Sequence, residues 1–178
     1  MANRNRLIAW VKLHDLVWRM LLPHPRILVD ADACPVKDEI CEIAYRRGVA
    51  VTIVANSWFR VPQHPLITRV VVDGGFDAAD DWIAGQADAT CVVVTADILL
   101  ADRCLKAGAT VIAHNGKPFT PASIGGAIAT RAIMADLRVG AAGNREAITG
   151  GPAPFAKADR SRFRSALDEA LVRLERAA

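Results

Sequence analysis

Acidic side chains follow three separate apolar runs of this 178-residue chain. The run "RILV" is followed by Asp30 and Asp32, and the run "CVVV" by "TADILLAD", which contains Asp97 and Asp102. A third run, "TRVVV", leads into "DGGFDAADD". The acids of that last segment are Asp73, Asp77, Asp80 and Asp81.

Carboxylates that converge on one crevice repel each other unless a cation neutralises them. No lysine or arginine accompanies the acids in all three segments, so we expect a bound metal ion to supply that charge. Hard oxygen ligands suit Mg²⁺ or Mn²⁺ and not zinc. Such ions polarise a phosphoryl group and generate a nucleophilic water. The pattern therefore predicts a divalent-cation site, with Asp32 and Asp102 as second ligands or orienting groups.

Each acid taken singly also has a structural explanation. Asp77 and Asp97 could each cap the start of a helix, and Asp80 and Asp81 would then lie in a first turn, where the helix dipole favours acids. Asp32 could begin the turn before Pro35. The coincidence of acids at three segment ends is what favours a shared site.

The elements that must position these acids form a regular alternation. Short β-branched runs alternate with helical stretches, and Gly48 and Gly108 stand where helices should stop. Buried strands alternating with helices indicate an α/β fold with a mostly parallel sheet of about five strands covered on both faces, and ligands bind at the carboxyl ends of such strands. The expected strands are 26–30, 50–55, 68–73, 91–95 and 109–114, and the expected helices are 36–47, 78–87, 98–107, 122–138 and 159–175.

Composition and charge limit the remaining possibilities. We expect one domain, residues 26–178, preceded by a basic helical extension, residues 1–25. Residues 1–26 have a net charge of +4 and the remainder −1, so the body offers only weak electrostatic support for nucleic-acid binding. No apolar run is long enough to span a bilayer. The four cysteines show no zinc spacing, and we expect reduced thiols, a cytoplasmic location and no membrane partner.

Two enzyme classes place acids in this way. One is a metal-dependent nuclease of the PIN/NYN kind. The other is a haloacid-dehalogenase-like phosphatase, in which a D-x-D pair supplies the nucleophile and the acid; "DADAC" and "DILLAD" match that pattern superficially. No lysine lies between Lys37 and Lys106, so the phosphatase interpretation lacks its charge stabiliser.

Several motifs, in order, resemble the YaiI/YqxD family of bacterial proteins over about residues 26–172. They include "ILVDADACPVKDEI", "VANSWFRVP", "VVDGGFDAADDWIA", "VVTADILLADRCLKAGATVI", "IGGAIATRAIMADLRVG" and "GGPAPFAKADRSRFRSALD". The family has no established activity and is grouped with PIN-like domains. The resemblance therefore implies a PIN-like three-layer α/β/α fold and a metal-dependent ribonuclease.

The resemblance can be carried over position by position. Asp30 resembles the first-strand acid of PIN-like nucleases, and Asp97 resembles the fourth-strand acid. Asp77, with Asp80 or Asp81, resembles the acids on the helix before the fourth strand. The chain departs from the pattern at Leu99, where NYN-type nucleases often have a second acid. It departs again at His114 and Asn115, where many PIN domains carry a further acid, and both departures count against a full two-metal site.

Basic side chains complete the predicted site, with RNA as the expected partner. Lys37, Arg60 and Arg160 are the candidates for holding a phosphate backbone, although surface charges of this kind are commonly only solvated. The leading hypothesis is hydrolysis of RNA phosphodiesters, with Asp30 and Asp97 catalytic. A non-catalytic metal- or nucleic-acid-binding protein and a small-molecule phosphohydrolase are the alternatives.

Overall fold

The structure, a computed structural model, describes residues 24–32, 34–72, 75, 77–140 and 155–177. Of the predicted extension, residues 1–25, the structure describes only residues 24 and 25. Asp73 lies outside the described residues. Within the described part of the chain, no helix combines the length and apolar character needed to cross a membrane.

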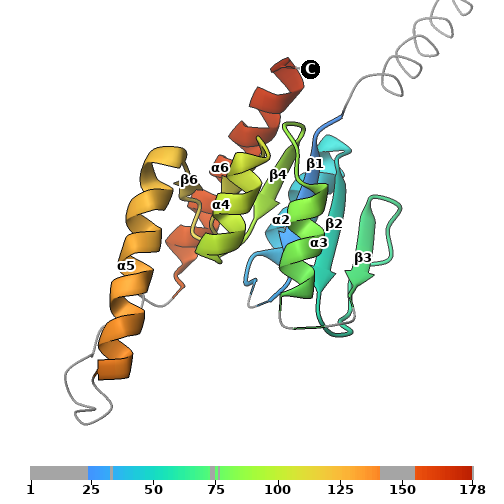
Figure 1. Cartoon of the computed structure of the whole chain (residues 1–178). Coiled ribbons are helices and arrows are strands. Elements are labelled where there is room, and N and C mark those ends of the chain that lie inside the picture. The colour runs from blue at the N-terminus through green and yellow to red at the C-terminus, as the bar shows by residue number, and fades with distance from the viewer. Residues whose placement is uncertain (1–23, 33, 73–74, 76, 141–154, 178) are drawn as a thin grey trace, which may run out of the picture.

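A six-stranded sheet forms the centre of the molecule, in the order β3-β2-β1-β4-β5-β6 (Figure 1). The first five strands in this order are parallel, and β6 is antiparallel to β5. The strands are β1 (Arg26–Asp30), β2 (Ala50–Ala55), β3 (Ile67–Val71), β4 (Cys91–Val94), β5 (Thr110–Ile112) and β6 (Pro118–Phe119). The helices are α2 (Lys37–Arg47), α3 (Ala78–Gln86), α4 (Ile98–Lys106), α5 (Pro121–Gly140) and α6 (Lys157–Ala177).

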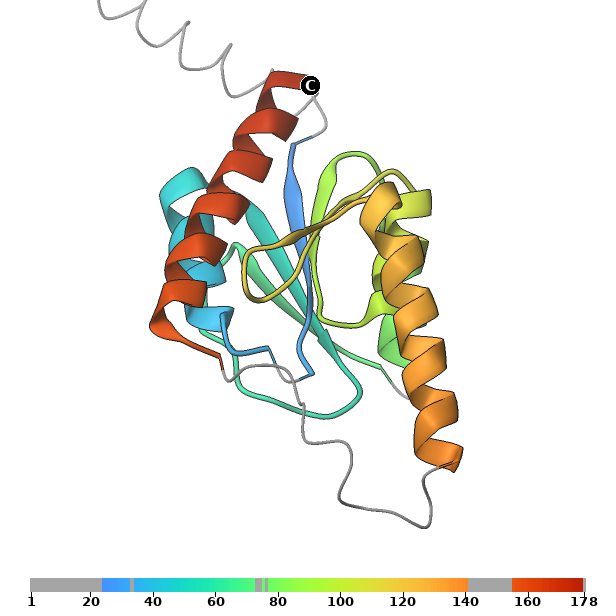
Figure 2. The same ribbon diagram turned by 90° about the vertical axis from the view of Figure 1, so that its left-hand side faces the viewer.

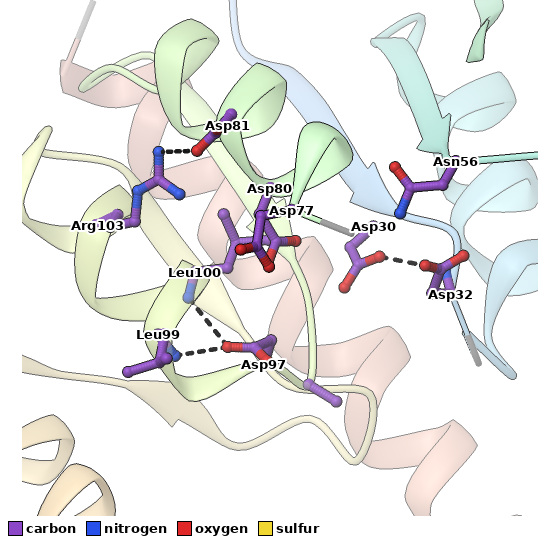
Figure 3. A pocket seen from close by; sticks show the side chains of 11 residues that line it. Asp30, Asp32, Asn56, Asp77, Asp80, Asp81, Asp97, Leu99, Leu100 and Arg103 are labelled. Carbon is purple, nitrogen blue, oxygen red and sulfur yellow. Dashed lines mark hydrogen bonds and ion pairs between the residues drawn. The ribbon is translucent and has the colours of Figure 1, made fainter. Parts of the chain in front are cut away.

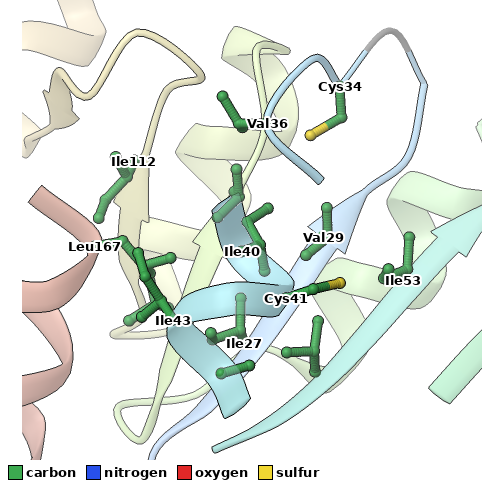
Figure 4. Packing of buried hydrophobic residues seen from close by; sticks show 14 of the residues in the cluster. Ile27, Val29, Cys34, Val36, Ile40, Cys41, Ile43, Ile53, Ile112 and Leu167 are labelled. Carbon is green, nitrogen blue, oxygen red and sulfur yellow. The ribbon is translucent and has the colours of Figure 1, made fainter. Parts of the chain in front are cut away.

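Alternation along the strands divides the core into two halves. Ile27 and Val29 of β1 face the layer of α2 and α6, where Ile40 and Leu167 pack against them (Figure 4). Leu28 points to the opposite layer, which consists of α3, α4 and the start of α5. Because successive strand residues face opposite sides, a strand buried on both faces must be apolar at every position. The predicted three-layer α/β/α fold with a mostly parallel sheet is confirmed.

Helix α6 lies beside α2 on the same face of the sheet (Figure 2). Arginines of each helix reach acids of the other: Arg47 Nε lies 2.6 Å from Asp168 Oδ1, and Arg164 Nη2 lies 2.7 Å from Glu42 Oε2. The turn after β5 approaches this helix closely, since a Cβ on Gly116 would lie 2.6 Å from the carbonyl carbon of Arg162. The last helix is therefore an integral part of the domain.

The predicted element boundaries hold to within a few residues. Strand 50–55 is β2, and Gly48 ends α2 in the left-handed conformation with φ +69°, as a C-cap glycine does. The sixth strand was not predicted, because β6 has only two residues and one of them is a proline. All four cysteines are buried and free.

Candidate functional site

The chain reverses its direction of travel across the sheet between β1 and β4. From β1 it continues outward through β2 to β3, and it then returns to β4 on the other side of β1. Loops leave the two sides of such a switch point in opposite directions, so a crevice opens at the carboxyl ends of the two strands. Here those ends are Asp30 of β1 and Thr95, which follows β4.

The crevice at this point has a volume of about 770 Å³ and a predominantly acidic lining (Figure 3). Three parts of the chain supply its carboxylates: the end of β1, the first turn of α3 and the start of α4. The acidic residues are Asp30, Asp32, Asp77, Asp80, Asp81 and Asp97. Six of the seven predicted metal ligands therefore line one crevice, and we name it the acidic crevice.

Asp30 is the most buried acid of the crevice, with 7% of its surface exposed. Because Val29 pairs with Val94 in the sheet, the next residues, Asp30 and Thr95, lie side by side. The Thr95 hydroxyl donates to Asp30 Oδ2 at 2.8 Å, and the Asp32 amide donates to Asp30 Oδ1 at 3.1 Å. Burial raises the pKa of Asp30, with a further contribution from the charges of Asp32 and Asp97, while these hydrogen bonds oppose the rise.

Asp97 both caps a helix and lines the crevice. Its Oδ1 accepts hydrogen bonds from the amides of Leu99 at 2.7 Å and Leu100 at 3.2 Å, at the start of α4. The Asp97 amide donates to Thr95 Oγ1 at 3.0 Å. The buried Thr95 hydroxyl thus connects the first-strand and fourth-strand acids, and it fixes their relative position.

Asp77 and Asp80 project from the start of α3. Asp77 occupies the N-cap position, but its side chain makes no capping hydrogen bond. Instead, Asn56 Oδ1, at the end of β2, accepts from the Ala79 amide at 3.1 Å. Burial raises the pKa of Asp80 to about 6, together with the charges of Asp30, Asp97 and Asp77, against the opposing charge of Arg103. Capping therefore does not explain Asp77, and Asp80 lies among negative charges that Arg103 offsets only in part.

The crevice also contains a cationic side chain, which the sequence pattern did not predict. Arg103 of α4 lines it, and its Nη2 lies 2.8 Å from Asp81 Oδ1. Its neighbour Asp102 is not among the lining residues, and its Oδ2 lies 2.7 Å from Lys106 Nζ, one turn further along the same helix. The two side chains therefore have different surroundings: Arg103 faces the crevice, whereas Asp102 pairs along its own helix. Sequence reasoning missed Arg103 and Asn56, although Asn56 directly follows a strand and the rule of strand ends could have found it.

The predicted phosphate-binding residues lie outside the acidic crevice. Lys37 begins α2, with Nζ 5.6 Å from the centre of the Phe59 ring. Arg60 lines a separate hollow beside β3. Arg160 donates to Glu39 Oε1 at 2.6 Å and to the Pro35 carbonyl at 3.1 Å, so it joins α6 to the start of α2.

The carboxylates suit a hard cation in type but are not already gathered around one position. Among the residues that the structure describes, no three acidic, histidine or cysteine side chains lie close enough to hold one ion. The charges of Asp30 and Asp97 nevertheless raise the pKa of Asp80, and the charge of Asp97 raises the pKa of Asp30. Cation binding would therefore require a change of rotamer in these side chains.

Comparison with known sequences gives a consistent result over most of the chain. A family model described as "Uncharacterized BCR, YaiI/YqxD family" matches residues 28–173. A UPF0178 protein of Sphingopyxis alaskensis is 70% identical over 152 residues, which cover 85% of this chain and 96% of the relative. A UPF0178 protein of Nitrobacter winogradskyi is 59% identical over 152 residues, covering 85% of this chain and 94% of the relative. No solved structure matches the chain significantly.

Proposed function

The chain belongs to the YaiI/YqxD family, and from this premise we propose that its acidic crevice binds Mg²⁺ or Mn²⁺ and hydrolyses RNA phosphodiesters. The carboxylates of the crevice favour a bound divalent cation more directly than they favour any one substrate. The RNA substrate follows from the likeness to PIN-like nucleases and from the position of the crevice at the switch point of the sheet.

The convergence of six carboxylates on one crevice is the observation that carries the proposal, and the pKa of Asp80, raised to about 6, agrees with it. Partial burial and the nearby charges of Asp30, Asp77 and Asp97 disfavour its ionised form, and Arg103 offsets this only in part. A divalent cation bound among these carboxylates would neutralise their mutual repulsion and so stabilise the folded protein. Perturbed acids in a crevice are also typical of functional sites.

The side chains in and beside the crevice have distinct parts in this proposal. Asp30, Asp80 and Asp97 would hold the ion, while the Thr95 hydroxyl positions the Asp30 carboxylate beside the backbone of Asp97. A bound Mg²⁺ or Mn²⁺ would supply a polarised phosphoryl oxygen and an activated water. Arg103, beside Asp81, can contact a phosphate oxygen of the substrate and orient it.

Thermal unfolding with and without Mn²⁺ tests the cation site. We expect Mn²⁺ to raise the melting temperature of the wild type, because a ligand that binds only the folded state stabilises it. Asp80→Asn should melt higher than the wild type in EDTA, since it removes repulsion, and should gain less from Mn²⁺. Glu169→Gln on α6, an exposed acid outside the crevice, should behave as the wild type does.

Cleavage of single-stranded RNA in Mn²⁺ then tests the reaction. Asp97→Asn is the informative variant, because asparagine is as good an N-cap as aspartate and preserves the start of α4. Mn²⁺-dependent cleavage that Asp97→Asn abolishes and Glu169→Gln retains supports the proposal. Equal cleavage by all three proteins indicates contamination, and an equal Mn²⁺ response of wild type and Asp80→Asn contradicts the site.

A binding protein without hydrolysis is the second candidate, and Leu99 favours it. Leu99 lines the crevice and is exposed there, at the position where NYN-type nucleases often have another acid. His114, after β5, is buried and is not among the crevice residues. A Mn²⁺-dependent thermal shift without cleavage of any RNA would support this candidate.

A small-molecule phosphohydrolase is the third candidate. Asp32 lies in the crevice beside Asp30, and Arg103 provides there the cation that the sequence pattern of a phosphatase lacked. Release of phosphate from p-nitrophenyl phosphate, lost in Asp30→Asn, would favour this reaction over cleavage of RNA.

A further inference from the structure

A second hollow, of about 800 Å³, lies beside β3 at the edge of the sheet. The loop between β2 and β3 and the first residues of β3 form it, and we name it the Trp58 hollow. Arg60, Thr68 and Arg69 are among its lining residues, and none of the described residues that line it is acidic. Its charge is therefore opposite to that of the acidic crevice.

Trp58 is the most exposed large apolar side chain of the described residues, with 67% of its surface accessible. The guanidinium of Arg69 lies 4.9 Å from the centre of its ring. Arg69 is itself held by a hydrogen bond from Nη1 to the Phe59 carbonyl at 2.8 Å. The indole is thus held beside a fixed positive charge while most of it remains in contact with solvent, which suits stacking against another flat group.

The Trp58 hollow and the acidic crevice are lined in part by residues that are close together in the sequence. Asn56 lines the crevice and Trp58 lines the hollow, with only Ser57 between them. Two residues span at most about 7.6 Å between Cα atoms. One extended polymer can therefore reach both places, with neighbouring units in each.

We propose that the Trp58 hollow holds the unpaired strand of RNA next to the phosphate that lies in the acidic crevice. A base stacks on Trp58, and Arg60 and Arg69 neutralise phosphates of the same strand. This inference rests on the proposed function and specifies its substrate as single-stranded, because a base must leave its helix to stack on a protein side chain. Aromatic and cationic side chains in one groove are the usual means of binding such strands.

The positive charge of the Trp58 hollow favours one of the possible occupants over the others. A peptide could add to the exposed edge of β3, and so could a second copy of this chain, but neither requires two arginines around an exposed indole. A polyanion with flat bases does use both. Arg160, which is engaged with Glu39, is not part of this surface.

Fluorescence anisotropy in EDTA, with the full chain and labelled oligouridylate, tests the inference without any cleavage. We expect the wild type to bind this unstructured strand more tightly than a duplex of the same length. Trp58→Ala should raise the Kd about 10-fold, since it removes the aromatic face on which a base stacks. Arg60→Gln and Arg69→Gln should each make the negative slope of log K against log salt shallower by about 0.7.

Two control variants separate stacking from folding and from general charge. Trp58→Phe keeps an aromatic face and should retain most of the affinity. Arg176→Gln removes an exposed charge from the last turn of α6, which lies near the start of β1 (Figure 2). Arg176 lines neither the crevice nor the hollow, so this change should leave the salt slope unchanged.

Several results would overturn the inference. Three of them concern binding: equal affinity of Trp58→Ala and the wild type, a preference for duplex, or no binding of RNA in EDTA. The fourth is that Trp58→Ala only dissociates a dimer in gel filtration and has no other effect. Cleavage by the wild type in Mn²⁺ would still support the proposed function in each of these cases. Binding that depends on Trp58, without cleavage in Mn²⁺, would contradict the hydrolytic function alone.

Discussion

The acidic crevice and the Trp58 hollow are separated in the chain by one residue, yet their side chains are held in opposite ways. Asp30 is 7% exposed and hydrogen-bonded to a neighbouring strand, whereas Trp58 is 67% exposed and contacts a charge on the surface. The crevice is built at the ends of central strands and at the starts of the helices packed on them. The hollow is built from a connecting loop laid against an edge strand.

This difference suggests a division of labour between the two regions. Chemistry on a phosphate needs charges fixed to within a fraction of an ångström, which the ends of packed strands supply. Recognition of a flexible strand needs accessible surface, which loops supply. Substitutions in the crevice should therefore affect stability more than substitutions in the hollow do. Substitutions in the hollow should have the larger effect on the affinity for single-stranded RNA.

The largest expected effect on stability comes from Thr95→Val in the crevice. The change keeps the shape of the side chain but removes the hydroxyl that donates to Asp30 and accepts from the Asp97 amide. A buried carboxylate then loses a partner, and we expect the free energy of unfolding to fall by about 2 kcal/mol. Urea denaturation in EDTA measures this.

Thr68→Val, in the hollow, is the matched control for Thr95→Val. Thr68 is exposed on β3, and its change should alter the free energy of unfolding by less than about 0.5 kcal/mol. Equal losses for the two variants would remove the distinction between the two regions.

A smaller effect is expected from pH, through Asp80. Its pKa of about 6 in the folded protein lies above the ordinary value of 3.8, so the folded state binds this proton more tightly than the unfolded chain does. Its contribution to stability is fully present below the ordinary value and is lost as the pH rises through about 6. In EDTA, between about pH 4.5 and about pH 7.5, the wild type should lose about 1 kcal/mol more than Asp80→Asn, because solvent screens part of the repulsion.

Urea midpoints at the two pH values, for both proteins, measure this difference. Glu169→Gln should follow the wild type at both, since the residue is exposed on α6. Saturating Mn²⁺ should abolish the difference at the higher pH. Parallel pH profiles for the wild type and Asp80→Asn would show that repulsion in the crevice is negligible.

The smallest effect is expected from Arg69→Gln in the hollow. The change removes a cation above the Trp58 ring and a hydrogen bond to the Phe59 carbonyl, both in contact with solvent. We expect a loss of about 0.5 kcal/mol in the free energy of unfolding, because exposed cation–π contacts are weak. A loss as large as that of Thr95→Val would indicate that the hollow, too, is part of the rigid frame.

Much of the fold and part of the site could be predicted from local sequence patterns. The run "RILV" before Asp30 predicted a buried strand that ends in an acid, and β1 ends at Asp30. Asp97 was expected either as a helix cap or as a crevice acid, and it is both. These predictions succeed because strand burial and helix capping depend on residues close together in the chain.

Other assignments depended on contacts between distant residues. Asn56, and not Asp77, caps α3, across 23 positions of sequence. Arg160, named from the sequence as a candidate for phosphate binding, pairs with Glu39 across 121 positions and joins two helices. No local pattern distinguishes these outcomes, because they depend on how the elements pack.

By itself, the sequence determined that acids would gather at one edge of a parallel sheet, because all parallel strands end at the same edge. Only the tertiary structure decided which acids face the crevice and which cation lies among them. Asp102 and Arg103 are neighbours in sequence, but only Arg103 lines the crevice. The rotation of α4 against the sheet, set by the packing of Leu100, Ala101 and Cys104 in the core, determines which of the two side chains faces it.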